Sequence, residues 1–424
     1  MRPNFSYKMK IFKFGGASVK DAESVRNVAS VLGHFPNEEI LVVVSAMGKT
    51  TNALEAIVQA YSSGKGDPTA LITDVKEYHF NIINELFPAD EHRVHNDVEI
   101  LFTQLEIICQ SKPAGSYNQI YDQIVGFGEL ISTKIVSSYL NSTGYQNKWL
   151  DARRLIRTDQ NYRFARVDWN FTERMVNDTI QQGNRYVTQG FIGSDDDLNP
   201  TTLGREGSDY TASVLGYVLG ADEVVIWKDV PGVLNGDPKV FDNTELLKSI
   251  SYREAIELAY YGASVIHPKT IQPLQRKNIP LKVKSFVNPE NEGTVITSGA
   301  DLDPMLPCFI KKDHQIIITI STRDLAFIAE DHLSKVYKLF HQHGVRVNVS
   351  QNTAVSSSFC INHDPIIVPQ LLEDLEQDFE VQVQENVNLY TVRHYDENSK
   401  QRVCSQGDML LEQISRKTYQ VVVA

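Results

Sequence analysis

Apolar runs and helical repeats alternate along roughly the first 295 residues. Runs rich in β-branched and aromatic residues predict strands at 10–14, 40–45, 149–151, 185–191, 223–227 and 281–286. The run 41–44 is apolar without alternation, which is typical of a strand covered on both faces. Between the strands, spacings of three and four residues predict helices, the first after Asp21, its expected N-cap. Long helical patterns at about 73–110, interrupted near Pro88, and at 117–140 follow. This alternation predicts an α/β sandwich.

A different pattern begins after the segment 288–307, where three prolines and two glycines predict a domain boundary. The following pattern predicts, in order, a strand at 315–320, a helix at 327–342, strands at 345–349 and 355–361, a helix at 365–378 and a strand from 381. This β-α-β-β-α-β order is ferredoxin-like. A polar loop after Tyr395, a short helix near 409–414 and a strand at 419–423 end the chain. We therefore predict a first domain over 1–295 and a second region over 308–424, with one full unit at about 313–395 and a partial second unit.

Composition narrows the class of protein. The 424 residues are 42% hydrophobic and 22% charged, with a formal charge of −12, as in an ordinary globular protein without a broad nucleic-acid footprint. No apolar run approaches the roughly 20 residues that span a bilayer, and the N-terminus lacks a signal-peptide core. The four cysteines are scattered without a Cys-x-x-Cys pair, which argues against zinc and disulfide frameworks. We expect a cytoplasmic protein with no membrane or nucleic-acid partner.

Two strand ends carry groups suited to an anion. Lys13 precedes the pair Gly15 and Gly16 at the start of a helix, where exposed backbone amides and a cation favour phosphate. A Gly-Gly turn alone is weak evidence, and the P-loop pattern is absent. The second strand ends at Ser45 and Ala46, followed by Thr51, although Thr51 or Asn52 could equally be only a helix N-cap.

Two further stretches place charged residues beside glycines. Glu129 follows two glycines inside a helical stretch, where each glycine costs about 1 kcal/mol, so the break has a packing or ligand reason. This carboxylate is as consistent with a solvated surface as with a buried polar contact. In the stretch 203–212, Arg205 lies between two glycines, and Ser208 and Asp209 open an apolar helix. Arginine suits bidentate binding of carboxylate or phosphate, while Asp209 is either an N-cap or a group that orients Lys13.

The strand at 223–227 is followed by Lys228, Asp229, Asp237 and Lys239. Pro-Gly and Asp-Pro pairs explain turns here. They do not explain two basic residues at the carboxyl end of a strand, where α/β proteins bind ligands. The histidines add little: His267 before Pro268 is structural, and His92 with His95 is more consistent with a solvated face than with a metal site.

In combination, these segments resemble the aspartate kinases of the amino acid kinase superfamily. The matching motifs are K-F-G-G-[TS]-S-V at 13–19, V-V-V-S-A at 42–46, [SG]-F-G-E at 126–129, Q-G-F-I-G at 189–193, L-G-R-G-G-S-D-Y-T-A at 203–212, W-T-D-V-P-G…D-P-R at 227–239 and F-G-A-K-V-L-H-P at 261–268. Each motif is modest, but their order over residues 10 to 295 is specific. The C-terminal region is similar to the ACT regulatory domains that follow such catalytic domains.

The resemblance implies a fold, an activity and a set of site residues. The fold is an α/β amino acid kinase-like three-layer sandwich with a C-terminal ferredoxin-like (ACT-like) α+β region. The activity is ATP- and Mg²⁺-dependent phosphorylation of the L-aspartate side chain to 4-phospho-L-aspartate, the first step of lysine, threonine and methionine biosynthesis. The implied residues are Lys13 and Asp209 for catalysis; Ser45, Ala46, Thr51, Glu129, Phe191, Arg205 and Ser208 for substrate; and Lys13, Gly15, Gly16, Lys228, Asp229, Asp237 and Lys239 for ATP. No protein ligand of Mg²⁺ is implied.

The resemblance also implies regulation and assembly. A lysine or threonine effector is expected at the C-terminal region, and a homodimer or higher homo-oligomer is expected because ACT-like sheets pair at their edges. The chain departs from the motifs at Ala17, Glu206, Lys228, Lys239 and Ser264. The alternatives are therefore a non-catalytic amino-acid sensor with a degenerate kinase fold, or another carboxylate kinase of the superfamily.

Overall fold

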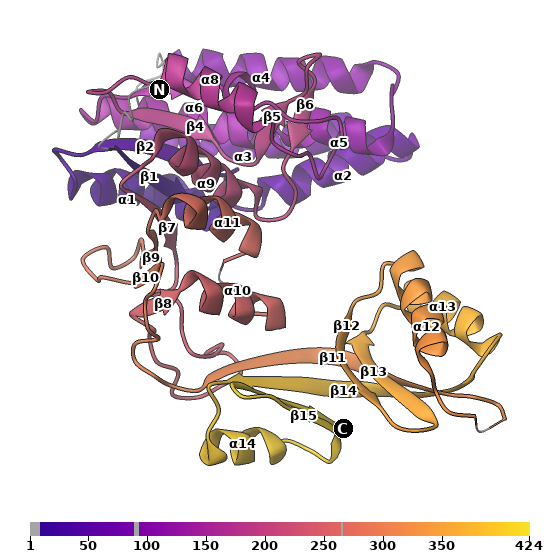
Figure 1. Ribbon diagram of the computed structural model, residues 1–424. Helices are drawn as coiled ribbons and strands as arrows, with labels where there is room; N and C mark the ends of the chain where they lie inside the picture. The colour runs from indigo at the N-terminus through magenta and orange to yellow at the C-terminus, as the bar shows by residue number, and fades with distance from the viewer. Residues whose placement is uncertain (1–8, 89–92, 264–265, 325) are drawn as a thin grey trace. The chain divides into compact units, whose positions relative to one another are not determined.

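A computed structural model describes residues 9–88, 93–263, 266–324 and 326–424 (Figure 1). The chain forms two compact units. The first comprises Met1–Val233, Leu246–Ala255 and Ile266–Asp301, and the second comprises Leu234–Glu245, Ile256–Val265 and Leu302–Ala424. Two short segments before residue 266 thus group with the C-terminal unit. The functional limits of 1–295 and 308–424 stay a prediction.

An eight-stranded sheet forms the centre of the first unit, in the order β3-β4-β2-β1-β7-β9-β10-β8. Its strands are β1 (Met9–Phe14), β2 (Glu39–Val44), β3 (Lys148–Leu150), β4 (Tyr186–Gln189), β7 (Glu223–Lys228), β8 (Ser249–Ser251), β9 (Leu281–Ser285) and β10 (Thr294–Thr297). The six predicted strands are confirmed and run parallel, whereas β10 is antiparallel to β9. The carboxyl ends of β1, β2, β4 and β7 therefore share one edge of the sheet.

Helices cover both faces of this sheet. The elements are η1 (Gly16–Val19), α1 (Ala22–Gly33), α2 (Thr50–Ser63), α3 (Pro68–Leu86), α4 (Arg93–Gln110), α5 (Tyr117–Val125), α6 (Phe127–Ser142), α7 (Ala152–Leu155), α8 (Trp169–Thr179), α9 (Gly207–Leu219), α10 (Tyr252–Tyr261) and α11 (Pro268–Lys277). Phe12 and Val42 pack in one core cluster with α1 to α6. On the opposite face α9 contacts β1, β2 and β7. The predicted three-layer α/β sandwich is confirmed.

Local sequence signals explain several helix limits. Asp21 caps α1 as predicted, its carboxylate accepting a hydrogen bond from Ser24 N at 2.7 Å. The glycine break is also present, because α5 ends at Val125 and α6 begins at Phe127. A Cβ on Gly128 would lie 2.9 Å from Ala46 Cβ, so the glycine lets α6 approach the end of β2 closely. A short antiparallel hairpin, β5 (Ile192–Ser194) and β6 (Pro200–Thr202), follows β4 and was not predicted.

The second unit contains a six-stranded antiparallel sheet in the order β12-β13-β11-β14-β16-β15. Its elements are β11 (Cys308–Ser321), α12 (Glu330–Gln342), β12 (Val347–Asn352), β13 (Ser356–Asn362), α13 (Ile367–Glu376), β14 (Glu380–Arg393), α14 (Glu397–Cys404), β15 (Met409–Ile414) and β16 (Thr418–Val423). The succession from β11 to β14 confirms the ferredoxin-like order. The aliphatic face of β11 packs against α12 and α13 in their own core.

The short helix predicted near 409–414 is wrong, because these residues form strand β15. β15 pairs with β16, and this pairing between separate segments outweighs the weak local pattern. The helix lies instead in the predicted polar loop, as α14, where Asp396 accepts a hydrogen bond from Ser399 N at 2.7 Å. β11 and β14 are 14 residues long, and the β14 residues 388–393 pair with β16. The C-terminal strands thus extend the same sheet.

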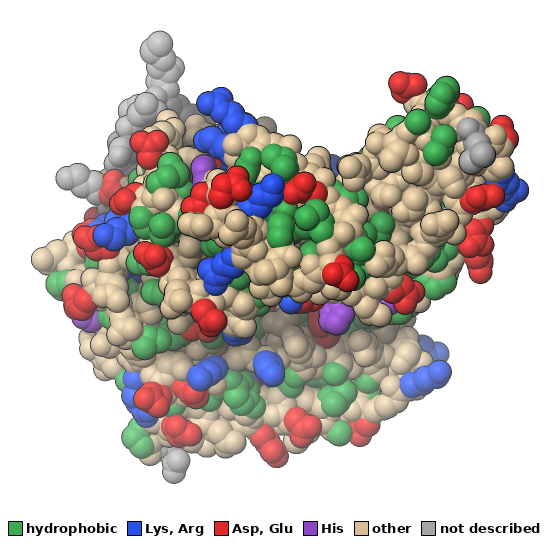
Figure 2. All heavy atoms as spheres, turned by 90° about the horizontal axis from the view of Figure 1, so that it is seen from below, with side chains coloured by type: hydrophobic (Ala, Val, Ile, Leu, Met, Phe, Trp, Pro, Cys, Tyr) green, Lys and Arg blue, Asp and Glu red, His purple; other side chains and the backbone are tan. Residues whose placement is uncertain are grey.

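The surface adds two observations. Acidic and basic side chains are interspersed on the face shown in Figure 2 rather than separated by sign. Among the described residues, no helix combines the length and the apolarity needed to cross a membrane.

Candidate active site

A pocket of about 510 Å³ lies in the first unit at the carboxyl ends of β1, β2 and β7. It is lined by Lys13, Ser45, Thr51, Tyr121, Glu129, Arg163, Phe164, Phe191, Thr202, Gly204, Arg205, Glu206, Gly207, Ser208, Asp209 and Lys228. Parallel strands commonly place ligand sites at this edge. The pocket thus gathers side chains from segments as far apart in sequence as Lys13 and Lys228.

A buried ion pair lies at the end of β1. Lys13 Nζ is 2.6 Å from Asp209 Oδ1, and their side chains are only 11% and 4% exposed. Lys228 Nζ lies 4.0 Å from Asp209 Oδ2, so one carboxylate faces two ammonium groups. α9 begins at Gly207 after the N-cap residue Glu206, so Asp209 is not the N-cap. This cluster has a net positive charge, which suits a group that neutralises phosphate.

Glu129 is buried beside this cluster. Its Oε1 accepts a hydrogen bond from Ala46 N at 3.2 Å, while Oε2 has no hydrogen-bond partner among the described residues. Burial raises the pKa of Glu129 to about 8, although the Ala46 N–H and the charge of Lys13 oppose the shift. Of the two alternatives for Glu129, a solvated surface carboxylate or a buried polar contact, the buried contact is therefore correct. An incoming ammonium group would satisfy its free oxygen.

The glycines after Lys13 allow two loops to meet. A Cβ on Gly16 would lie 2.8 Å from Gly48 O, and one on Gly15 would lie 3.3 Å from Lys13 Nζ. Gly48 N also donates to Gly16 O at 3.0 Å. Neither Gly15 nor Gly16 lines the pocket, but Gly15 lies against the lining residue Lys13. Thr51 is not the N-cap of α2, which begins at Thr50, and it lines the pocket instead.

The end of β4 meets the first turn of α9. A Cβ on Gly190 would lie 2.4 Å from Ser208 Cβ, so the glycine allows this contact. Phe191 N donates to Thr211 Oγ1 at 3.0 Å. These contacts bring Phe191 and Ser208 into the pocket that also contains Arg205.

Glu206, which departs from the family motif, has a structural role. Its φ is +53°, in the left-handed region that favours glycine, which explains why the motif has glycine there. The Glu206 carboxylate accepts a hydrogen bond from His267 N at 2.8 Å. His267 itself caps α11 by accepting from Lys269 N at 3.1 Å, which confirms its structural role. Glu206 thus ties the start of α9 to the start of α11.

The remaining residues predicted to bind the nucleotide do not line this pocket. Asp229 is exposed just beyond β7 and is not among the lining residues. Asp237 and Lys239 belong to the second unit, where they are exposed and Lys239 N donates to Asp237 Oδ1 at 2.9 Å. His92 and Ser264 lie outside the described residues. Within the described ranges, no group of three or more His, Cys, Asp or Glu side chains could hold a metal ion.

Four lining residues were missed by the sequence analysis: Tyr121, Arg163, Phe164 and Thr202. No motif marked them. Their place in the pocket depends on the loop after α7 lying beside β6, where Ala165 N donates to Thr202 O at 3.0 Å. Arg163 also has a φ of +69°, which the sequence does not signal.

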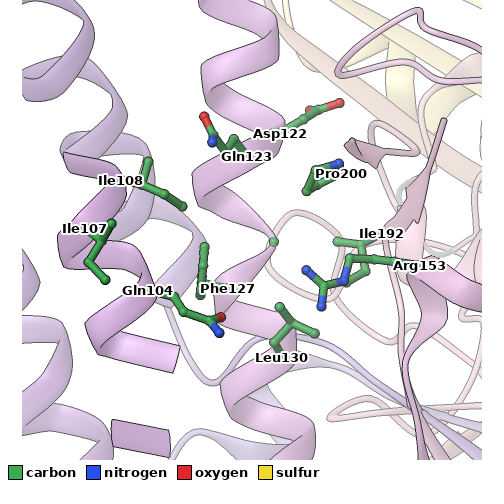
Figure 3. A pocket seen from close by; sticks show the side chains of 11 residues that line it. Gln104, Ile107, Ile108, Asp122, Gln123, Phe127, Leu130, Arg153, Ile192 and Pro200 are labelled. Carbon is green, nitrogen blue, oxygen red and sulfur yellow. The ribbon is translucent and has the colours of Figure 1, made fainter. Parts of the chain in front are cut away.

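A second pocket, of about 360 Å³, is lined by residues of α4, α5, α6 and β5 and is mainly apolar (Figure 3). Ile107, Ile108, Phe127, Leu130 and Ile192 form most of its wall. Arg153 reaches into it beside Ile192, but its guanidinium is already paired with Asp151 at 2.7 Å. None of the predicted site residues lines this pocket.

The fold and the pocket define a three-layer α/β protein with a charged pocket at the carboxyl edge of a parallel sheet. The family model described as the amino acid kinase family matches residues 8–285. The chain belongs to the amino acid kinase family.

Several curated relatives that match this chain carry the word aspartokinase in their names. The chain is 33% identical over 374 residues to Aspartokinase 1, chloroplastic, of Arabidopsis thaliana, a match covering 86% of this chain but 65% of that protein. Its fold matches E. coli aspartokinase III in complex with aspartate and ADP, with a TM-score of 0.80, 25% identity and coverage of 98% and 96% of the two chains. The same enzyme in complex with lysine and aspartate matches with a TM-score of 0.82 at the same identity and coverage.

Proposed function

We propose that the protein is an aspartate kinase that transfers the γ-phosphoryl group of ATP to the side-chain carboxylate of L-aspartate. The observation that carries this proposal is the combination in one pocket of a buried carboxylate, Glu129, with the Lys13–Asp209 pair and the guanidinium of Arg205. An amino acid requires one site of each sign, and a transferring phosphoryl group requires a further cation. The solved complex of aspartokinase III with aspartate and ADP supports the same pair of ligands.

The roles of the residues follow from their charges. A carboxylate nucleophile is already ionised at neutral pH, so the reaction needs no general base, and catalysis depends on positioning and charge neutralisation. Lys13, oriented by Asp209, stabilises charge on the transferring group. Arg205 binds the α-carboxylate of aspartate, and Glu129 accepts hydrogen bonds from its ammonium.

Nucleotide binding is proposed for Lys13, Gly15, Gly16, Lys228, Asp229, Asp237 and Lys239. Mg²⁺ neutralises phosphate charge when it is bound. The lack of a metal-binding cluster among the described side chains is compatible with an ion carried mainly by the nucleotide phosphates.

The second unit is proposed to bind a regulatory amino acid, lysine or threonine. The ferredoxin-like order of its elements and the lysine complex of aspartokinase III support this proposal. β12 and β15 lie at the two edges of its sheet, and an open edge favours pairing with a second copy, so we propose a homodimer or higher oligomer. Titrating the full chain with each amino acid by calorimetry tests the regulation; if neither binds, alone or together, the unit is an assembly module.

A non-catalytic amino-acid sensor is the second candidate, favoured by the departures at Glu206 and Lys228. Trapping an acyl phosphate as a hydroxamate separates the two functions. An aspartate kinase forms hydroxamate with ATP and aspartate but not with a panel of other carboxylates. Clean amino-acid binding without any hydroxamate would establish the sensor instead.

A further inference from the structure

The pocket contains a second guanidinium for which the family motifs give no role. Arg163 lines the same pocket as Glu129 and Arg205. Within the described part of the chain, no acidic side chain forms a salt bridge with Arg163. Its Cζ lies 4.4 Å from the ring centroid of Tyr121 and 5.8 Å from that of Tyr117. Aromatic rings hold a guanidinium in place without cancelling its charge, so Arg163 remains able to bind an anion.

A buried carboxylate fixes the backbone that carries Arg163. Asp122, on α5, is fully buried, and both of its oxygens accept hydrogen bonds from Arg163 N, at 3.1 and 3.0 Å. The same carboxylate accepts from Thr202 N at 2.8 Å and from Thr202 Oγ1 at 2.7 Å. Figure 3 shows Asp122 on α5 at the border of the apolar pocket. Asp122 therefore joins the Arg163 loop to β6 and holds Arg163 in its left-handed conformation.

The Arg163 loop lies against the residue that precedes Arg205. A Cβ on Gly204 would lie 3.1 Å from Arg163 O and 3.0 Å from Phe164 Cδ1. The absence of a side chain at Gly204, whose φ is +78°, thus permits this close approach. As a consequence, the backbones of Arg163 and Arg205 are neighbours on one wall of the pocket.

We propose that Arg163 is a specificity-determining residue that binds the α-carboxylate of the substrate together with Arg205. This inference rests on the proposed aspartate kinase function. The two oxygens of a carboxylate offer about four acceptor positions, enough for two guanidinium groups. In the proposed complex, Glu129 binds the ammonium of aspartate and Lys13 binds the phosphoryl group. The α-carboxylate therefore needs other partners. Two guanidinium groups make a free α-carboxylate a requirement, so the site rejects substrates in which that group is an amide.

The first test replaces the guanidinium with a neutral amide. Arg163→Gln is expected to raise KM for aspartate about 10- to 100-fold, as expected when a charge-assisted contact is lost, with kcat and KM for ATP nearly unchanged. Arg166→Gln is the matched control, because Arg166 is exposed on the same loop and does not line the pocket. The control should retain wild-type kinetics. An unchanged KM for aspartate in Arg163→Gln would overturn the proposal.

The second test identifies the substrate group that Arg163 contacts. The α-amide of aspartate retains the reacting side-chain carboxylate but lacks the α-carboxylate. Wild-type protein should use the α-amide with a much lower kcat/KM than aspartate. In Arg163→Gln, kcat/KM for aspartate should fall while kcat/KM for the α-amide stays nearly unchanged. The preference for aspartate should therefore fall by the same factor as kcat/KM for aspartate. If Arg163 only supports the fold, both substrates lose equally and the preference stays at its wild-type value, which refutes the assignment.

A third comparison tests the role of Asp122 as a positioning residue. Asp122→Asn should raise KM for aspartate in wild-type protein but add little in the Arg163→Gln background, because both changes remove the same contact. Additive effects would contradict this role. The proposed function fails separately, if wild-type protein forms no hydroxamate with aspartate. In that event calorimetry with aspartate and its α-amide decides the Arg163 assignment, and equal or absent binding of the two refutes it.

Discussion

Aspartate binding should depend on the ionisation of Glu129. Burial raises the pKa of this carboxyl group to about 8, and its Oε2 has no hydrogen-bond partner among the described residues. The unliganded protein at neutral pH therefore holds Glu129 mainly as the neutral acid. Only the carboxylate can pair with the ammonium of aspartate, so binding should release a proton from Glu129.

The size of the effect follows from the pKa. With a value of about 8, roughly one tenth of the unliganded protein is ionised at Glu129 at pH 7, and the apparent affinity is reduced by that fraction. The apparent Kd for aspartate should thus be about eightfold lower at pH 8.5 than at pH 7, and about threefold higher at pH 6.5 than at pH 7. At pH 7 close to one proton should be released for each aspartate bound.

Calorimetric titration in two buffers of different ionisation enthalpy measures both quantities. The range from pH 6.5 to 8.5 lies above the pKa of Asp122, which burial raises to about 6, so that group contributes little. Glu129→Gln should bind aspartate weakly and with no pH dependence across this range. A pH-independent Kd in the wild type, or the same slope in Glu129→Gln, would refute the reasoning.

Protein stability provides a second measurement of the same group. The folded-state pKa of Glu129 is raised above its ordinary value of 4.5 to about 8, so the folded state holds the proton more tightly than the unfolded state. The free energy of unfolding of the unliganded protein should therefore decrease as pH rises from about 4.5 to about 8, by up to about 1.4 kcal/mol per pH unit. Glu129→Gln should remove the Glu129 contribution and be the more stable protein at pH 8, while the contribution of Asp122 below about pH 6 should remain.

Three further substitutions test individual side chains. Lys13→Met should lower kcat and kcat/KM together by roughly 10²–10³, because a preorganised charge is lost, and near-wild-type hydroxamate formation would exclude Lys13 from the reaction. Arg205→Ala should raise KM for aspartate by about one to two decades while KM for ATP is unchanged; a rise in KM for ATP instead would assign Arg205 to the nucleotide. Glu206→Ala should destabilise the fold by about 1 kcal/mol in urea unfolding, because the bond to His267 N is lost while φ stays positive, whereas Glu206→Gly should be nearly neutral. Equal effects of the two Glu206 variants would show that backbone strain at this position is unimportant.

The local pattern of apolar, polar and glycine residues was sufficient to predict much of the fold. Continuous apolar runs predict β1 and β2 because strands covered on both faces need apolar side chains at every position. The Asp21 cap and the glycine break before α6 are also local, since each depends on a few neighbouring residues. The ordered motifs place the catalytic and substrate candidates at the ends of these elements, and the pocket brings Lys13, Glu129, Arg205 and Asp209 together.

Other features depend on contacts between distant segments, which a local pattern does not encode. β15 was predicted as a helix because its pairing with β16 is absent from its own six residues. The burial of Glu129 depends on α6 packing against the end of β2, and Glu206 acquires its role from His267, 61 residues away. Arg163 belongs to none of the motifs identified in the sequence.

The sequence by itself thus determined the layers, the family and the chemical identity of the main charged groups. Tertiary structure decided which carboxylate is desolvated, which strands close the C-terminal sheet, and that Arg163 lies beside Arg205. The physical reason is that burial, strand pairing and charge proximity depend on distances between segments far apart in the chain, whereas the sequence pattern reports only the preferences of neighbouring residues.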